Sequence, residues 1–114
     1  MKIIIVDDNP HISELLAFMI SSIGYQVNTF EHPDHALAHM EEADIKPHVL
    51  ITDYNMPGMT GYELHKKTIQ HAPDVNTIVI SGRPLDKQVG DLHFMQKPFN
   101  PDHIIKLIET FKPA

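Results

Sequence analysis

Cysteine is absent from this sequence, and so are a long apolar run and an excess of positive charge. Without cysteine there is no disulfide framework and no thiolate chemistry, so stability has to come from packing. The amino terminus is apolar only from Ile3 to Val6, which is too short for a membrane span or a signal peptide. Nine Lys and Arg against 15 Asp and Glu give a net charge of −6, which argues against direct binding of nucleic acid. We therefore expect a cytoplasmic protein that binds neither membranes nor nucleic acid directly.

Short apolar segments alternate along the chain with segments of helical periodicity. The 114 residues suit one domain, which we expect to extend over residues 1–114. Apolar and β-branched runs predict strands at residues 2–6, 26–30, 49–53, 77–81 and 94–96. Helical spacing predicts helices at residues 10–23 and 33–43, from residue 60 to about residue 71, and after residue 100. This alternation predicts a doubly wound α/β fold with a five-stranded parallel sheet.

Cap signals mark where three of the helices begin. Asn9-Pro10 and Asn100-Pro101 each pair a capping side chain with a proline at the first helical position. Thr60 and Glu63 have the spacing of a capping box. The apolar spacing predicts that each helix turns one face toward the core. The predicted core-facing residues are Ile12, Leu15, Leu16, Met19, Ile20 and Ile23, then Ala36, Leu37 and Met40, then Leu64 and Ile69, and finally Ile104, Ile105, Leu107, Ile108 and Phe111.

Reactive side chains stand where the predicted strands end. Asp7 and Asp8 follow the first strand, Asp53 ends the third, Ser81 ends the fourth and Lys97 follows the fifth. Because parallel strands end at one edge of a sheet, where open α/β sheets bind ligands, we expect these groups to meet. Carboxylates that pack together repel unless a cation enters, and Mg²⁺ prefers oxygen ligands. We predict that the acids and one backbone carbonyl bind Mg²⁺, that Asp53 attacks a phosphoryl group, and that Lys97 and Ser81 hold its oxygens.

Four motifs together resemble those of the receiver domains of two-component response regulators. They are Ile3-Ile4-Ile5-Val6-Asp7-Asp8, Asp53-Tyr54-Asn55-Met56-Pro57-Gly58-Met59, Ile80-Ser81-Gly82 and Lys97-Pro98-Phe99. The resemblance covers essentially the whole chain. It implies a flavodoxin-like sheet with the strand order 2-1-3-4-5. It also implies a phosphoacceptor in a two-component phosphorelay, which is no enzyme beyond catalysing its own phosphorylation and dephosphorylation.

The same resemblance assigns the acids their roles. Asp53 would accept a phosphoryl group from a sensor histidine kinase or a small phosphodonor, and a histidine phosphotransfer protein is a further possible partner. Asp8, Asp53 and the main-chain carbonyl of Asn55 would bind Mg²⁺. Asp7 would act mainly through a water molecule. These residues would form the phosphorylation site.

The resemblance also implies how the site is read. Lys97, in a cis Lys97-Pro98 peptide, would contact the phosphoryl group. Ser81 and Phe94 would form a switch pair, in which the hydroxyl moves toward the phosphoryl group and the aromatic ring follows inward. The switch would change a surface that binds a downstream protein target, an output domain or a second copy of the chain.

The segment between the fourth and fifth predicted strands departs from the family pattern. Only the eleven residues from Gly82 to Leu92 connect these strands, and Pro84 and Gly90 interrupt them. An unbroken helix could extend only over residues 85–89. We therefore predict that the helix in this position, the fourth of the family, is shortened or missing, and that the surface it would form differs from that of other receivers.

Two other functions are compatible with a sheet of this kind. A receiver-like interaction or dimerisation module would not need phosphorylation of Asp53. A flavodoxin-like cofactor binder would need a phosphate loop rich in Ser, Thr or Gly after the first strand, and the acidic segment Asp7-Asp8-Asn9-Pro10 has the wrong charge for one.

Histidines offer a further candidate site. His32, His35 and His39 have helical spacing, which could suggest a metal site. The apolar face of their helix is expected to leave them in solvent, and we expect the same of His65 and His71. We therefore predict no metal site at the histidines.

Overall fold

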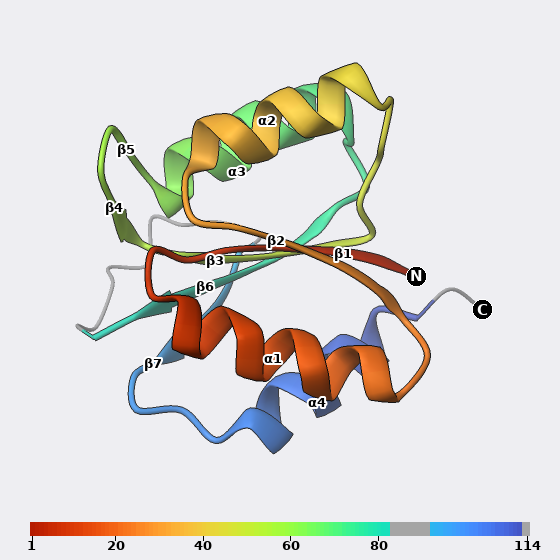
Figure 1. Cartoon of the computed structure of the whole chain (residues 1–114), viewed down its shortest axis with the longest axis vertical. Helices are drawn as coiled ribbons and strands as arrows, with labels where there is room; N and C mark the ends of the chain where they lie inside the picture. Colours follow the sequence, from red (N-terminus) through yellow and green to blue (C-terminus); the bar gives the residue numbers. More distant parts are fainter. Residues whose placement is uncertain (83–91, 113–114) are drawn as a thin grey trace.

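Five parallel strands form one sheet at the centre of the molecule (Figure 1). The computed structural model describes residues 1–82 and 92–112. In sheet order, the strands are β2 (Gln26–Phe30), β1 (Lys2–Val6), β3 (Val49–Asp53), β6 (Asn76–Ser81) and β7 (His93–Gln96). This order confirms the predicted 2-1-3-4-5 topology, and every strand boundary lies within one residue of its predicted position.

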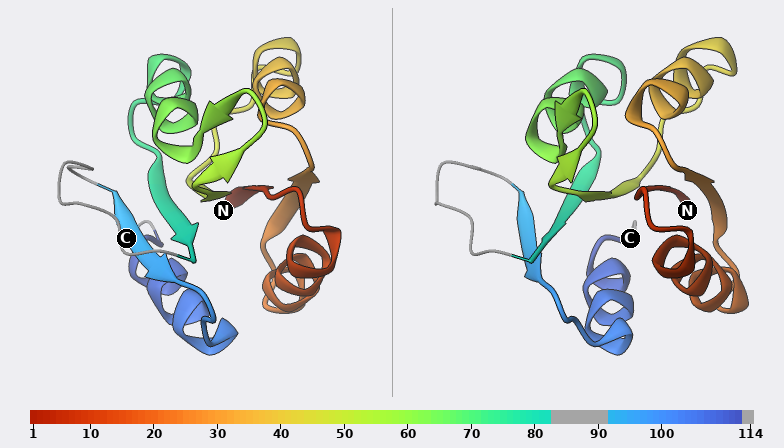
Figure 2. Two further views of the ribbon diagram at one scale, coloured as in Figure 1. Left: turned by 90° about the vertical axis from the view of Figure 1, so that its left-hand side faces the viewer. Right: turned by 60° about the vertical axis from the view of Figure 1, so that its left-hand side comes forward.

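In the described part of the chain, four helices cover the two faces of the sheet (Figures 1 and 2). Helices α1 (Pro10–Ser22) and α4 (Pro101–Thr110) lie on one face, and α2 (Pro33–Glu42) and α3 (Gly61–His71) lie on the other. The predicted caps are present: the side chains of Asn9 and Asn100 accept backbone N–H groups, and Thr60 and Glu63 form both bonds of a capping box. In the described part of the chain, no helix is long and apolar enough to span a membrane.

The central strands are buried on both faces, so their side chains contribute to two cores. One core, under α1 and α4, contains Ile3, Ile5, Leu16, Ile20, Val49, Ile51, Ile78, Ile80, Ile104 and Ile108. The other core, under α2 and α3, contains Ile4, Val6, Ala36, Met40, Leu50, Met59, Leu64, Ala72 and Val75. The absence of polar alternation in β1 and β3 follows from this double burial.

Three predicted core residues lie on the surface instead. Leu15 and Ile23 of the α1 region are 51% and 45% exposed, and Ile69 of α3 is 36% exposed. The predictions were wrong because the apolar stripe is wider than the face that the sheet covers. In α3, Thr68 is buried in place of its neighbour, and its hydroxyl donates to the Leu64 carbonyl at 2.8 Å. A polar side chain is therefore buried here without an unsatisfied group.

A small hairpin follows β3. β4 (Asn55–Met56) and β5 (Met59–Thr60) pair antiparallel, with Asn55 opposite Thr60. Gly58 has φ +87°, which other residues seldom adopt. The hairpin projects beside α3 at the carboxyl ends of the strands (Figure 2). The predicted loss of a helix at residues 85–89 falls outside the described residues.

Candidate functional site

Three carboxylates meet at the edge where the parallel strands end. Asp7 and Asp8 follow β1, and Asp53 is the last residue of β3, the strand beside β1. The register places Val6 opposite Thr52, so β1 and β3 end at the same level of the sheet. One oxygen of each acid lies within 4.8 Å of the others. The structure therefore brings together the three acids that strand order predicts to be neighbours.

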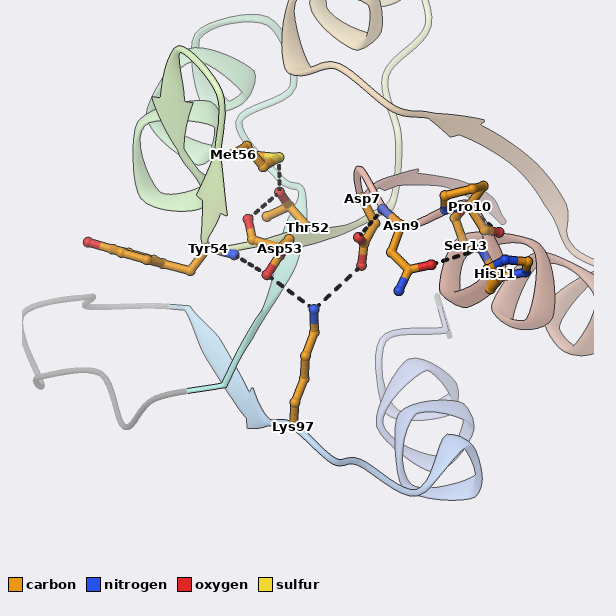
Figure 3. Close-up of polar contacts among 10 residues, drawn as sticks. All are labelled: Asp7, Asn9, Pro10, His11, Ser13, Thr52, Asp53, Tyr54, Met56 and Lys97. Carbon is orange, nitrogen blue, oxygen red and sulfur yellow. Dashed lines mark hydrogen bonds and ion pairs between the residues drawn. The ribbon is translucent and has the colours of Figure 1, made fainter.

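Lys97 faces this cluster from the end of β7 (Figure 3). Its Nζ lies 3.5 Å from Oδ1 of Asp53 and 4.0 Å from Oδ2 of Asp7. Its backbone N–H donates to the Ser81 carbonyl at 2.7 Å, which fixes the start of the loop against β6. The Lys97-Pro98 peptide is cis, as predicted. One ammonium group thus serves two carboxylates from different strands.

Burial controls the electrostatics of the two inner acids. Asp7 is only 2% exposed, and its burial raises the pKa of the carboxyl group despite the Asn9 N–H and the Lys97 charge, which lower it. Burial also raises the pKa of Asp53, against the lowering effect of Lys97 and of the Tyr54 N–H. The hydrogen-bond donors and the lysine of the site therefore do not fully compensate the cost of burying the two carboxylates.

This arrangement fits a hard divalent cation. Oδ1 of Asp7 accepts the Asn9 N–H at 2.8 Å, whereas Oδ2 is buried with no hydrogen-bond partner among the described residues. Three carboxylates so close together repel one another unless a cation binds. Oxygen donors of this kind are those that Mg²⁺ prefers, so the donor set suits Mg²⁺.

The remaining predicted site residues lie in different environments. Ser81 ends β6 and is buried, Phe94 of β7 is half-buried, and Asn55 of β4 is exposed. Asp8 is the exposed member of the acidic cluster. These placements put all of the predicted residues on β-strands or on the loops directly after them.

Two contacts of Asp53 were not foreseen from the sequence. The backbone N–H of Tyr54 donates to Oδ1 of Asp53 at 3.0 Å, and the Thr52 hydroxyl donates to the Asp53 carbonyl at 2.9 Å (Figure 3). A backbone N–H has no residue type to signal it. A threonine inside an apolar strand was a visible signal, because a hydroxyl at a buried position needs a partner.

Three of the five histidines predicted to lie in solvent are less exposed than predicted, whereas His32 and His35 are exposed as predicted. Nε2 of His39 is buried and the ring lies 5.3 Å from that of Phe30, while Nδ1 of His65 lies 2.7 Å from the Thr77 hydroxyl. His71 is partly buried, with Nε2 3.7 Å from Asp44. The prediction of solvated rings was wrong for these three, because His39 packs against Phe30 of β2, His65 lies against Thr77 of β6 and His71 lies beside Asp44. Among the described residues, no group of histidines is placed to hold a metal ion.

Comparison with known families agrees with this geometry. The family model described as "Response regulator receiver domain" matches residues 3–109. The chain belongs to the response regulator receiver family. Receivers are the signal-accepting domains of two-component systems, as the sequence motifs implied. Both the fold and the order of the strands are those expected of this family.

Relatives of this receiver occur as parts of larger regulators and as separate structures. It is 33% identical to the transcriptional regulatory protein FixJ of Rhizobium meliloti over 92% of this chain and 53% of that protein. It is 32% identical to the DNA-binding transcriptional regulator NtrC of Salmonella typhimurium over 92% of this chain and 23% of that protein. The chain thus spans about half, or less, of these curated relatives.

A solved structure of similar size gives the same fold. The chemotaxis response regulator CheY4 of Vibrio cholerae superimposes with a TM-score of 0.85 and 27% identity, over 97% of this receiver and 98% of that chain. TrrA of Thermotoga maritima, solved in complex with Mg²⁺ and BeF, has a TM-score of 0.79 and 26% identity, over 97% and 98%. The sheet and its helices are therefore common to receivers of diverse sequence.

Proposed function

We propose that Asp53 accepts a phosphoryl group in a two-component phosphorelay, in the presence of Mg²⁺. The observation that carries this proposal is the geometry of Lys97, which lies 3.5 Å from Asp53 Oδ1 and opposite the acidic cluster. A phosphoryl group arriving at Asp53 brings negative charge into a site that is already anionic. The lysine and a bound cation are the two positive groups that offset this charge.

The chemistry requires one bond to form and one to break. Oδ1 of Asp53 is held by the Tyr54 N–H and Lys97, so Oδ2 is the oxygen assigned to attack. As its bond to phosphorus forms, the bond from phosphorus to the donor nitrogen or oxygen breaks, and the leaving group keeps the electron pair. Lys97 and the Ser81 hydroxyl then contact the phosphoryl oxygens. Asp8, Asp53 and the Asn55 carbonyl would hold Mg²⁺, with Asp7 acting mainly through a water molecule, and the cation would supply positive charge against the carboxylates and the phosphoryl oxygens.

The proposed output is a change of protein-binding surface rather than turnover of another substrate. Phosphorylation adds about −1.5 to −2 charges, which is enough to reorganise nearby hydrogen bonds. The Ser81 and Phe94 switch pair would transmit this change through β6 and β7. The recipient is a downstream protein or an output domain, and a second copy of the receiver is a further candidate.

An apolar pocket beside Lys97 supports a protein as the phosphodonor. The pocket has a volume of about 470 Å³ and is lined by Ile12, Leu15, Lys97, Pro98, Phe99 and Pro101. Leu15 is 51% exposed and Phe18, one turn further along α1, is 72% exposed. A sensor histidine kinase or a histidine phosphotransfer protein, docked on this apolar surface, would present its phosphohistidine next to the acidic cluster.

Acetyl phosphate tests the proposal directly. Wild-type receiver incubated with Mg²⁺ and acetyl phosphate should gain the mass of one phosphoryl group, whereas Asp53→Asn should not. Asp74→Asn changes an exposed acid at the opposite ends of the strands and should label like the wild type. If wild type and Asp53→Asn give the same intact mass and the same response to Mg²⁺, the chain is an interaction or dimerisation module that works without phosphate.

A further inference from the structure

The peptide group between Asp53 and Tyr54 is held at both of its ends. Its N–H is shared between two acceptors, the Ile80 carbonyl at 2.8 Å and Oδ1 of Asp53 at 3.0 Å. Its carbonyl accepts the Thr52 hydroxyl at 2.9 Å. Because a peptide group is planar, the direction of the carbonyl determines the direction of the N–H. The Thr52 hydroxyl is therefore linked, through one rigid plane, to the carboxylate of Asp53.

The surroundings leave this hydroxyl little freedom. Thr52 is fully buried, and its Oγ1 also lies 3.6 Å from Sδ of Met56 in the hairpin (Figure 3). On the other side, Gly61 packs so closely that a Cβ there would lie 2.6 Å from the Asp53 carbonyl oxygen and 3.1 Å from Cγ2 of Thr52. The Gly61 N–H in turn donates to the Tyr54 carbonyl at 2.7 Å. The first turn of α3 thus closes around the same peptide group.

We propose that Thr52 is a positioning residue for phosphorylation. Its hydroxyl orients the Asp53-Tyr54 peptide, the peptide N–H fixes Oδ1 of Asp53, and the second oxygen is left aimed at the incoming phosphorus. Gly61 completes the device by leaving room for the carbonyl. This inference rests on the proposed role of Asp53 as phosphoacceptor. Thr52 touches neither the phosphoryl group nor the metal ligands' side chains in this scheme, so it acts only through the peptide.

Thr52→Val removes the hydroxyl at nearly constant volume, and Thr52→Ser restores it without the methyl group. Thr68→Val is a matched control, because Thr68 is equally buried and its hydroxyl also donates to a carbonyl, that of Leu64. All variants are compared as whole chains with Mg²⁺ and acetyl phosphate. The readouts are the phosphorylation rate, the thermal unfolding midpoint and the Tyr54 amide resonance in the ¹H–¹⁵N spectrum.

Thr52→Val should phosphorylate about fivefold more slowly, the factor that corresponds to about 1 kcal/mol of lost transition-state stabilisation. It should also shift the Tyr54 amide resonance, and Thr52→Ser should recover both values. Thr68→Val should lose comparable stability but keep the rate and the resonance. If Thr52→Val keeps the wild-type rate, or slows no more than Thr68→Val, the inference is wrong.

Two further results separate the possible failures. If Thr52→Val does not fold, Gly61→Ala tests the same peptide from its other side and should slow phosphorylation while shifting the Tyr54 resonance. An unchanged rate in Gly61→Ala would then overturn the inference. If the wild type itself gains no phosphoryl group, the proposed function fails first, and the Thr52 variants are not needed to show it.

Discussion

Polar side chains at the two ends of the parallel strands differ in exposure and in hydrogen bonding. At the amino ends, His48 is exposed and its Nδ1 accepts the Lys2 N–H at 3.0 Å. At the carboxyl ends, Asp7 is 2% exposed and one of its oxygens has no hydrogen bond among the described residues. Each end also has a pocket, of about 190 Å³ beside Asp74 and about 470 Å³ beside Lys97.

The difference teaches that buried charge, more than pocket shape, distinguishes the end of the sheet where the proposed site lies. Burying a carboxylate without full hydrogen bonding costs free energy. The amino ends avoid this cost by keeping their charged side chains in solvent. At the carboxyl ends a carboxylate is buried despite this cost, and the binding of a positively charged ligand can offset the cost. Three pairs of variants test this contrast. In each pair, one substitution lies at the carboxyl ends of the strands, and its control lies at the amino ends or elsewhere on the surface.

The largest effect is expected from Lys97→Met. Removing the ammonium group takes away the only protein cation that the described residues place against Asp53 and Asp7, so the phosphorylation rate from acetyl phosphate should fall about 100-fold. Lys46→Met, beside the pocket at the amino ends, should change the rate less than about twofold. Equal rates in the two variants would show that the two ends are not distinct. The rate is followed by intact-protein mass spectrometry.

An intermediate effect is expected from Leu15→Glu. A charge on the apolar surface beside the 470 Å³ pocket should slow phosphoryl transfer from a histidine kinase about tenfold, because it removes one buried contact with the docked donor. The rate from acetyl phosphate should stay unchanged, since this donor needs no docking surface. Ile69→Glu, on the exposed side of α3, is the matched control and should alter neither rate. If Leu15→Glu slows phosphorylation from both donors, the substitution disturbs the fold rather than the docking of the kinase.

The smallest effect is expected from Asp7→Asn, and it depends on pH. Above the ordinary pKa of 3.8 and up to its raised value, the folded state binds more protons than the unfolded chain, so the ionisation of Asp7 lowers the free energy of unfolding as pH rises. Without Mg²⁺, the variant should therefore be more stable than the wild type by about 1 kcal/mol at about pH 7, and equally stable at about pH 3.

The controls for Asp7→Asn use the other end and the cation. Asp74→Asn should lie within about 0.5 kcal/mol of the wild type at both pH values, because its carboxylate is exposed. Added Mg²⁺ should stabilise the wild type more than Asp7→Asn and so reverse their order. Chemical denaturation at each pH measures these differences. A wild type that exceeds Asp7→Asn in stability without Mg²⁺ would contradict the account of buried charge.

Most of the architecture could be predicted because it depends on local patterns. The double burial of β1 and β3 appears as unbroken apolar runs, and the Asn-Pro and Thr-x-x-Glu signals place the starts of α1, α3 and α4. The same patterns failed for Ile69 and Leu15. Their spacing fits a core-facing stripe, but the sheet covers only part of it, and a helix has no local signal for how wide its covered face is.

The residues of the site could be named from the sequence, whereas the hydrogen bonds that connect them could not. Strand order predicts that Asp7 and Asp53 are neighbours, and the motifs single out Lys97. No pattern indicates that a threonine hydroxyl turns toward the Asp53 carbonyl or that the Tyr54 N–H is shared. These contacts depend on the direction of a single peptide group, which the hairpin and the first turn of α3 determine together.

The sequence by itself determined the alternation of strands and helices, the helix starts and the set of reactive side chains. Each of these depends on propensity, periodicity or residue type within a short segment. Only the tertiary structure decided that Asp7 is buried, that its pKa and that of Asp53 are raised, and that Lys97 lies between them. The physical reason is that burial and electrostatic coupling arise from segments distant in the chain, which the pairing of β1, β3, β6 and β7 brings to one edge.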